Sequence, residues 1–293
     1  MFKHYLILLF LMFSTLAIGQ GWERVYAGGG QDEIRGIALT PDGGFVMAGY
    51  YNLSKLLLIK ADADGDLQWS KNFSATGHDV AGATAIIATR DSGYAIAGFV
   101  RVGSAPDSPR DLYLFKTDAH GNILWERTFG GPQNDEAKGL VELADGSLVV
   151  VGFTTNFLEP VTGDWTEDVF LAKTDVNGNE LWTKSVGQPL FKERGNGIVL
   201  APNGDLVVAG WRREQQSVPG DRDFYAARLD SDGNLLWSNT YGFSGLDDEA
   251  RAIAIASDVL MAEVTSKTAF WMISGSASVG KGREIMLIPL GGN

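Results

Sequence analysis

The amino-acid sequence predicts an all-β protein: a five-bladed β-propeller of four-stranded antiparallel blades, its ring closed by the N-terminal strand joining the last blade. Two observations predict this fold. A phrase ending in tryptophan recurs about every 50 residues, a period typical of propeller blades. The strands between these phrases are apolar on both faces, as at residues 148–151 and 206–209, which indicates sheets that are covered on both sides.

The repeated phrase reads Asp-x-x-Gly-x-x-x-Trp. Its glycine holds the fourth position of the turn and no glutamate closes the loop, so the phrase fits a hairpin turn better than a calcium loop. In such a turn the aspartate caps the backbone and the glycine takes a positive φ. Because the tryptophans keep one register in every unit, we expect them to pack between blades and not to bind ligands. They are Trp22, Trp69, Trp125, Trp182 and Trp237.

The third unit shows the expected blade most clearly. Residues 139–152 form two strands around the turn at Asp145 and Gly146, and residues 168–175 and 180–186 form the third and fourth. The first strands of the other units are expected at 36–39, 84–88, 197–200 and 251–256. Each unit is therefore a four-stranded meander.

The two ends of the repeat array predict how the ring closes. The fifth unit stops before its tryptophan strand, and a matching strand stands alone at residues 22–26. Pairing the two would complete a fifth blade and remove free strand edges. An open β-solenoid and a fragment of a longer array remain as alternatives. In this unit a longer excursion at 257–268 replaces the tight turn, and either covers a ring face or marks a degenerate blade.

Residues 1–19 have the pattern of a secretory signal peptide. Lys3 precedes an apolar run at 5–13, and small residues at Ala17 and Gly19 fit cleavage before Gln20. Residues 20–293 are then expected to form a single propeller domain, secreted to the exterior or the periplasm. No later segment approaches the ~20 apolar residues of a spanning helix, so no membrane span is expected in the mature protein.

Composition narrows the partners. The chain has 24 basic and 36 acidic residues, a net charge of −12 and no cysteine. An acidic protein repels the phosphate backbone, so nucleic acid is not an expected partner. The expected partner is a protein or a glycan of the cell envelope or the extracellular medium. No cofactor is expected.

Several short motifs resemble those of a known group. Residues 42–49 (Asp-Gly-Gly-Phe-Val-Met-Ala-Gly), residues 58–62, the turn that leads to each tryptophan, and Phe129-Gly-Gly131 are similar to repeats of exported Bacteroidota-type β-propeller proteins, often called bulb-type-lectin-like. The segment from turn to tryptophan also resembles quinoprotein-like propellers, although it is one residue shorter. The resemblance covers about residues 21–290 and implies a secreted or surface protein with a binding or structural role. No quinone-binding or mannose-binding residues match.

One set of loops carries an acid in every unit. These loops precede the first strands, and in a closed ring their carboxylates would approach the mouth of the central channel. A ring of acids could bind a cation, an amine or sugar hydroxyls. Arg35, Lys138 and Arg251 each follow a carboxylate at three residues' distance, so local ion pairs that orient the loops are the favoured interpretation. The candidate acids are Asp32, Asp79, Asp135, Glu193 and Asp248.

The loops between second and third strands vary in length, and variation on a regular scaffold is where specificity is usually found. The longest spans residues 154–167. Trp165 and Phe157 lie in it outside the repeat register, beside Asp164. These three complete the set of candidate ligand-binding residues.

A non-catalytic binding or interaction module is the function that the sequence favours. A carbohydrate-binding lectin is the first alternative, and a glycoside hydrolase-like propeller enzyme is the second. The enzyme is disfavoured because the acids are repeat equivalents, whereas paired catalytic carboxylates usually have unlike surroundings. Two carboxylates in a pocket without paired Arg or Lys would reverse that judgement.

Overall fold

The computed structural model describes residues 23–26, 31–52, 54–103, 105, 107–158, 165–214, 221–242, 247–256, 259–273 and 276–289. For residues 156–158, 165, 255, 256, 259–273 and 276–289 it describes the backbone alone.

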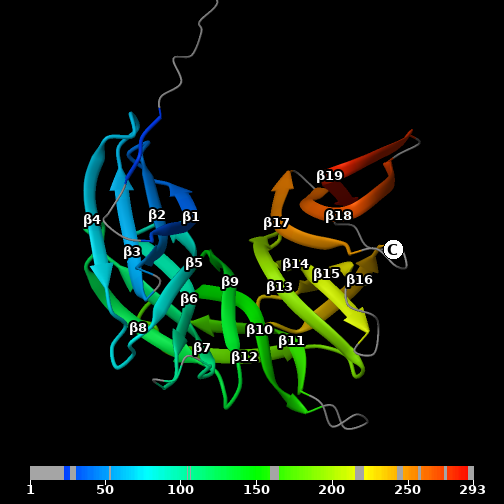
Figure 1. Ribbon diagram of the computed structural model, residues 1–293, viewed down its shortest axis with the longest axis horizontal. Coiled ribbons are helices and arrows are strands. Elements are labelled where there is room, and N and C mark those ends of the chain that lie inside the picture. The colour runs from blue at the N-terminus through cyan, green and yellow to red at the C-terminus, as the bar shows by residue number, and fades with distance from the viewer. Residues whose placement is uncertain are drawn as a thin grey trace, which may run out of the picture.

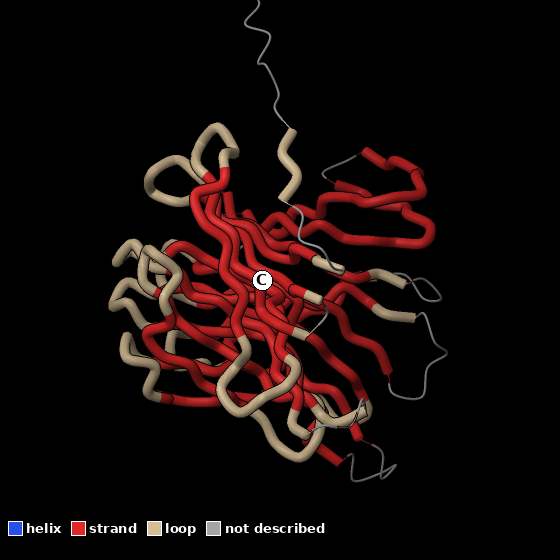
Figure 2. Tube along the Cα trace, turned by 60° about the vertical axis from the view of Figure 1, so that its left-hand side comes forward, coloured by secondary structure: helices blue, strands red, loops and turns tan. Residues whose placement is uncertain are grey.

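All secondary-structure elements in these ranges are β-strands, and the ranges contain no helix (Figure 2). Four sheets have four strands and a fifth has three, and in each sheet neighbours in sequence pair antiparallel. The sheets are β1 (Glu33–Leu39), β2 (Phe45–Tyr51), β3 (Lys55–Ala61) and β4 (Leu67–Phe73); β5 (Ala81–Ala88), β6 (Tyr94–Arg101), β7 (Arg110–Thr117) and β8 (Ile123–Phe129); β9 (Asp135–Glu142), β10 (Leu148–Leu158), β11 (Trp165–Thr174) and β12 (Glu180–Val186); β13 (Phe191–Leu200), β14 (Leu206–Glu214), β15 (Asp223–Leu229) and β16 (Leu235–Tyr241); and β17 (Glu249–Ala256), β18 (Val259–Ile273) and β19 (Ser276–Pro289).

The sheets stand side by side along an arc, as propeller blades do (Figure 1). The first strand of each sheet contacts the first strand of the next, from β1 through β5, β9 and β13 to β17. An apolar core fills each junction between described sheets. Tyr113 and Phe115 face the first sheet, Leu112 and Leu114 face the third, and the buried valines of β10 and β14 meet at the next junction. The prediction of strands covered on both faces is confirmed.

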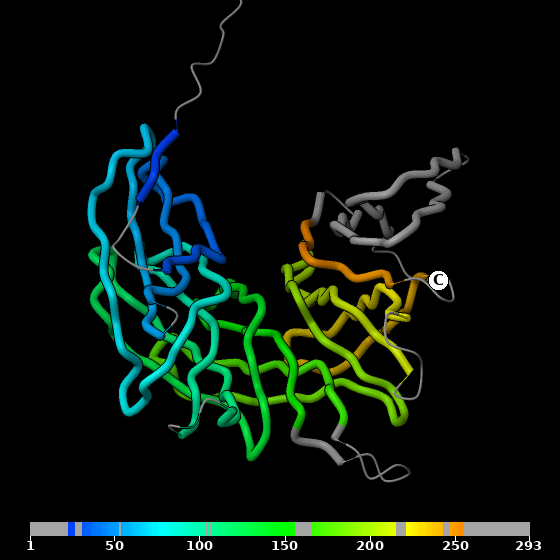
Figure 3. Tube along the Cα trace, viewed as in Figure 1, coloured from blue at the N-terminus to red at the C-terminus, as the bar shows by residue number. Residues whose placement is uncertain are grey.

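The predicted closed ring of five four-stranded blades is wrong for the described residues. The fifth sheet has only three strands, and the two ends of the arc stand apart (Figure 3). Residues 23–26 lie on the first sheet instead: the Tyr26 hydroxyl donates a hydrogen bond to the Gly65 carbonyl (2.6 Å), and Arg24 forms an ion pair with Asp66 (3.0 Å). Tyr26 packs on buried residues of the apolar outer face of that sheet. Residues 23–26 therefore cover this nearer surface. Trp22 lies outside the described residues.

The predicted excursion at 257–268 is also corrected. Residues 259–268 belong to the long strand β18, which pairs with β17 and β19. Residues 257 and 258 lie outside the described residues.

First strands begin earlier than the sequence predicts, because each continues through a β-bulge. The register shifts at the same place in every sheet, and in the first four sheets this place is opposite or next to a glycine of the second strand. At Gly98 an added Cβ would lie 1.9 Å from the Gly82 carbonyl oxygen, and at Gly152 it would lie 1.8 Å from that of Glu136. A bulge re-aims the residues before it. It brings Asp135 and Glu193, expected in loops, into the starts of β9 and β13.

The tryptophan phrases behave as predicted. Gly65, Gly121, Gly178 and Gly233 all have positive φ, between 72° and 79°. The tryptophan of one unit packs on the turn glycine of the next: Trp69 packs on Gly121, and Trp125 packs on Gly178. The indole N–H of Trp125 also donates to the Val176 carbonyl (3.1 Å). These contacts join neighbouring sheets at their outer edge.

A cation on the third strand reaches the first hairpin turn in three sheets. Lys60 pairs with Asp42 (2.9 Å), Lys116 with Asp91 (2.5 Å) and Arg228 with Asp205 (2.8 Å). Hydrogen bonding from the Thr40 hydroxyl, and then from Lys60, lowers the pKa of Asp42 to about 2.

We expect Asp42 to contribute to acid stability. A carboxyl group whose pKa is lower in the folded state contributes stability that is complete above its unfolded pKa and lost as pH falls through the folded one. The melting temperature of the wild type should therefore fall more steeply between pH 4 and 2 than that of Asp42→Asn. Parallel curves would contradict this, and thermal melts across that range provide the measurement.

Candidate functional site: carboxyl pairs between sheets

Three junctions between sheets carry a pair of carboxyl groups. One member opens the third strand of a sheet, and the other comes from the start of the next sheet. Both lie at the strand ends where the chain passes from the fourth strand of one sheet to the first strand of the next. The pairs are Asp111 with Asp135, Asp168 with Glu193, and Asp223 with Asp248.

Gly130 lies between the first pair. A Cβ added there would lie 2.5 Å from Asp135 Oδ2 and 2.6 Å from Asp111 Oδ1. Because both distances are shorter than a van der Waals contact, even a methyl group would not fit between Gly130 and the two carboxyl groups. Gly130 itself is exposed.

The loop over this pair is held in place from both sides. The Gly131 N–H donates to Asp135 Oδ2 (2.8 Å). The Asn134 side chain accepts a hydrogen bond from the Arg110 N–H (3.1 Å), and the Thr155 N–H donates to the Asn134 carbonyl (2.9 Å). The position of Asp135 is thereby fixed by both sheets.

The two acids have different electrostatic settings. Burial, and then the neighbouring Asp135 carboxylate, raise the pKa of Asp111 to about 6, while His78 acts in the opposite direction. No lysine or arginine contributes to this shift. Asp111 Oδ1 is buried without a hydrogen-bond partner among the described atoms. A carboxyl group whose pKa is raised in this way is suited to act as a general acid.

His78 lies beside this pair. Its Nδ1 is 3.0 Å from the Arg101 carbonyl oxygen. A carbonyl oxygen only accepts, so we assign the proton to Nδ1, and Nε2 of the neutral ring is then an acceptor.

Arg212 distinguishes the other two pairs. Glu193 is 1% exposed; burial raises its pKa to about 8, Asp168 adds to the increase, and Arg212 opposes it. Arg212 Nε lies 3.4 Å from Glu193 Oε1. Burial, Asp221 and Asp248 raise the pKa of Asp223, and Arg212 again opposes them. A guanidinium near an acid favours its ionised form, and its presence sets these two pairs apart from Asp111 and Asp135.

A groove of about 400 Å³ opens beside the first pair, between the outer strands β8 and β12. Asp135 and Gly130 line it with the rings of Phe129 and Phe170. Hydroxyl groups of Thr128, Thr183 and Ser185 complete the wall. Its volume and its mixture of apolar rings and hydroxyl groups suit a small polar ligand.

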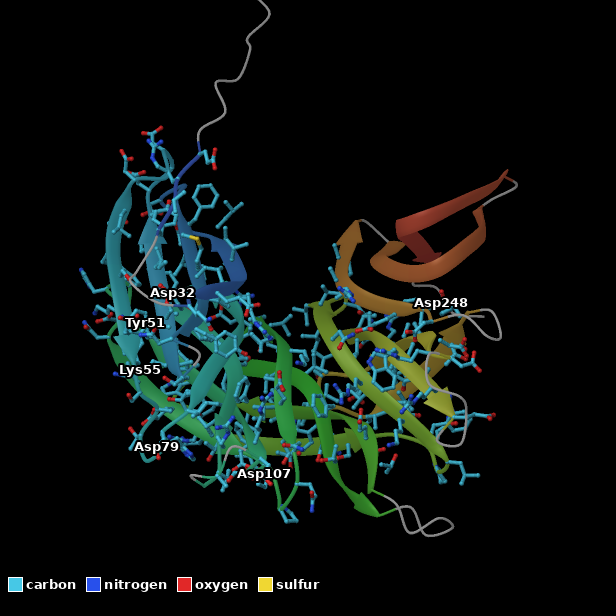
Figure 4. All side chains as sticks on the ribbon, viewed as in Figure 1. Asp32, Tyr51, Lys55, Asp79, Asp107 and Asp248 are labelled. Atoms are coloured by element: carbon cyan, nitrogen blue, oxygen red, sulfur yellow. The ribbon has the colours of Figure 1, made fainter. Side chains whose placement is uncertain are left out.

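The structure separates the predicted ring of acids into two groups. Asp135, Glu193 and Asp248 are buried and belong to the pairs, whereas Asp79 is exposed and Asp32 is half-buried, accepting from the Asn52 N–H (3.3 Å). Figure 4 shows Asp32 and Asp79 on one arm of the arc and Asp248 on the other. The five acids thus do not meet at one channel mouth.

Two of the three predicted local ion pairs form, those of Arg35 and Lys138, but through a different acid. Arg35 pairs with Glu33 (3.0 Å) and Lys138 with Glu136 (2.5 Å), each the residue after the candidate acid. The other predicted candidates are not tested: the side chains of Phe157 and Trp165, and the whole of Asp164, lie outside the described residues.

Sequence reasoning missed one half of each pair. Asp111, Asp168 and Asp223 occupy the same position at the start of the third strand, which is a repeat signal visible in the sequence. The contact between that position and the following unit depends on the bulge, which the strand pattern does not reveal.

Among the residues with described side chains, no group of three or more His, Cys, Asp or Glu is arranged to hold a metal ion. None of the described elements is a helix that could cross a membrane.

Comparison with known proteins gives a faint likeness in structure only. No family model and no curated protein matches the sequence. A Bacteroides caccae protein of unknown function is 14% identical over 75% of this chain and 85% of its own, with a TM-score of 0.38. A gluconolactonase from Xanthomonas campestris is 15% identical over 78% and 68%, with a TM-score of 0.44. A putative exo-β-1,3-galactanase from Bifidobacterium bifidum is 11% identical over 85% and 90%, with a TM-score of 0.45.

The expectation of a non-catalytic module is corrected. Most of the similar structures are described as enzymes, including a lactonase, a fructofuranosidase and a phosphorylase. At these scores the likeness itself says nothing about a reaction, so the physical reason lies in the chain. The pKa of Asp111 is raised by burial and by Asp135, with no lysine or arginine among the causes, which a scaffold ion pair does not show.

Proposed function

We propose that this protein is a hydrolase of the glycoside type, with Asp111 and Asp135 as its acid–base machinery. The observation that carries the proposal is the approach of both carboxyl groups to one point beside Gly130. Asp111, with a pKa of about 6, is the proton donor to the leaving oxygen. Asp135, which accepts a hydrogen bond from the Gly131 N–H, faces the positive charge that develops on the sugar.

The short separation favours one of the two known stereochemical courses. Inverting enzymes keep their carboxyl groups ~6.5–9.5 Å apart to hold a water between them, and retaining enzymes keep them ~5–5.5 Å apart. Oxygens of Asp111 and Asp135 both lie within 2.6 Å of one point, which leaves no room for that water. Asp135 would then attack the sugar, and Asp111 would afterwards deprotonate the water that releases it.

The wider setting of this proposal is export. A signal peptide at 1–19 would place the protein outside the cytoplasm, where oligosaccharides of an envelope or an extracellular matrix are the available glycosides. Within this proposal the arc of sheets is a propeller scaffold that holds the pair at the junction of the second and third sheets.

The test is a hydrolysis screen on the chain from Gln20. Aryl α- and β-glycosides and neutral and acidic oligosaccharides are incubated with the protein, and released reducing ends are measured. Turnover of at least one class, with retained configuration by NMR, is the expected result. A folded protein that binds sugars without cleaving any would favour the lectin instead, and one that neither binds nor cleaves any of them contradicts both.

We expect activity to fall as pH rises through about 6, the pKa of Asp111. The general acid must carry its proton, so kcat/KM should decrease about tenfold per pH unit above that value. A pH–rate profile from 4 to 9 on any cleaved glycoside measures it. A rate that rises through the same range would contradict the assignment of Asp111 as the acid.

A further inference from the structure

A second, smaller pocket lies between the first and second sheets. Its volume is about 200 Å³, and three arginines line it, Arg35, Arg101 and Arg110, with one acid, Glu33. Such a concentration of positive charge stands out in a chain of net charge −12.

Two of the guanidinium groups are fixed on aromatic rings. Arg35 Cζ lies 4.7 Å from the centre of the Tyr50 ring, and Arg110 Cζ lies 4.1 Å from that of Phe99. The two rings pack against each other at 5.9 Å and are almost fully buried. Stacking holds each guanidinium plane in place, which is the arrangement in which its N–H groups recognise oxyanions.

The third arginine, Arg101, has a hydrogen-bond donor that no described acceptor satisfies. Arg101 Nε is buried and has no hydrogen-bond partner among the described residues. A buried donor without an acceptor costs free energy, which a ligand oxygen would recover. By contrast, Arg35 already pairs with Glu33, and Arg110 pairs with Glu136.

The pocket adjoins the carboxyl pair. Arg110 precedes Asp111 in β7, and its partner Glu136 follows Asp135 in β9. Consecutive residues of a strand point to opposite faces of the sheet, so the arginines and the carboxyl pair lie at the same strand ends, on the two faces of the second sheet.

We propose that this pocket binds an oxyanion carried by a sugar of the substrate, a carboxylate or a sulfate, so that the substrate is an acidic glycan. That the bound glycan is a substrate rests on the proposed function. That the pocket binds an acidic glycan does not. Arg101 and Arg110 are the donors that we assign to the anion, because guanidinium groups bind carboxylate and sulfate oxygens with paired, charge-assisted hydrogen bonds.

The test measures binding without turnover. Uronate oligosaccharides, sulfated oligosaccharides and neutral oligosaccharides of equal length are titrated calorimetrically against the wild type, Arg101→Gln and Arg24→Gln. Arg24→Gln makes the same change in net charge at an exposed ion pair on the outer face of the first sheet. We expect one acidic class to bind, neutral sugars to bind at least about tenfold more weakly, and Arg101→Gln to lose about tenfold or more. Arg24→Gln should bind as the wild type does.

Thermal melts show whether Arg101→Gln is folded. Because Arg101 Nε has no partner to lose, its melting temperature should not fall below that of the wild type. Equal affinity for acidic and neutral sugars, or unchanged binding in Arg101→Gln, would overturn the inference. If acidic sugars are bound but not cleaved, the anion pocket stands and the hydrolase is rejected. If only neutral sugars are cleaved, the hydrolase stands and the anion pocket is rejected.

Discussion

Asp111→Asn is expected to lower kcat/KM on a cleaved glycoside by about 10²- to 10⁴-fold, because it removes the proton donor of the first step. The amide keeps the shape of the side chain but cannot deliver a proton to the leaving oxygen. The kcat/KM of substrates with good leaving groups, such as dinitrophenyl glycosides, should decrease much less, since their first step needs no protonation, while their kcat falls because the second step has lost its base. Steady-state rates on both kinds of substrate measure the difference.

Stability separates this loss from misfolding. The folded state raises the pKa of Asp111, so its ionised form opposes folding above pH 6. Asp111→Asn should therefore melt at the same or a higher temperature than the wild type at pH 7.5. Asp79→Asn is the matched control, since Asp79 is the exposed equivalent of Asp135 in the second unit. Equal losses in the two variants, or wild-type activity in Asp111→Asn, would remove Asp111 from the mechanism.

Gly152→Ala is expected to destabilise the protein by at least about 3 kcal/mol, since overpacking against fixed backbone cannot be relieved by a side-chain rotation. The new Cβ would lie 1.8 Å from the Glu136 carbonyl oxygen. The first strand of the third sheet must move away, and Asp135 moves with it. Urea denaturation of the variant and the wild type gives the difference in free energy of unfolding.

Gly204→Ala is the matched control for this change. Gly204 has a positive φ of 90°, but an added Cβ there would meet nothing within 4 Å. Its cost should be limited to about 1 kcal/mol of backbone strain. A similar cost in both variants would show that the bulge tolerates a side chain and does not position Asp135.

Repetition made most of the fold predictable. The turn glycines, the tryptophans that pack on them and the doubly buried strands follow from local rules that the chain applies in unit after unit. Closure was not predictable, because it depends on whether residues 23–26 find a better surface on the first sheet or on the last. The apolar face around Leu57 and Ile59 is adjacent and already formed, and it holds Tyr26.

Of the two acids of the candidate site, one could be predicted from the sequence. Asp135 was recognised because it repeats in a loop, but repetition was also the reason for giving it a scaffold role. Its neighbours differ from unit to unit: Asp111 lacks the guanidinium that Glu193 has in Arg212. Such differences arise from side chains distant in sequence, so equivalent positions in a repeat can have unequal chemistry.

The apolar cores at the described junctions are each shared by two neighbouring sheets, and this determines how the molecule comes apart. Stability in such a stack is close to a sum of terms for units and for the interfaces between adjacent units. Both terminal sheets have only one such interface. Opening should therefore proceed inward from the ends, and amide hydrogens of the second and third sheets should be the last to exchange. The junction that holds Asp111 and Asp135 would then outlast the loss of either end.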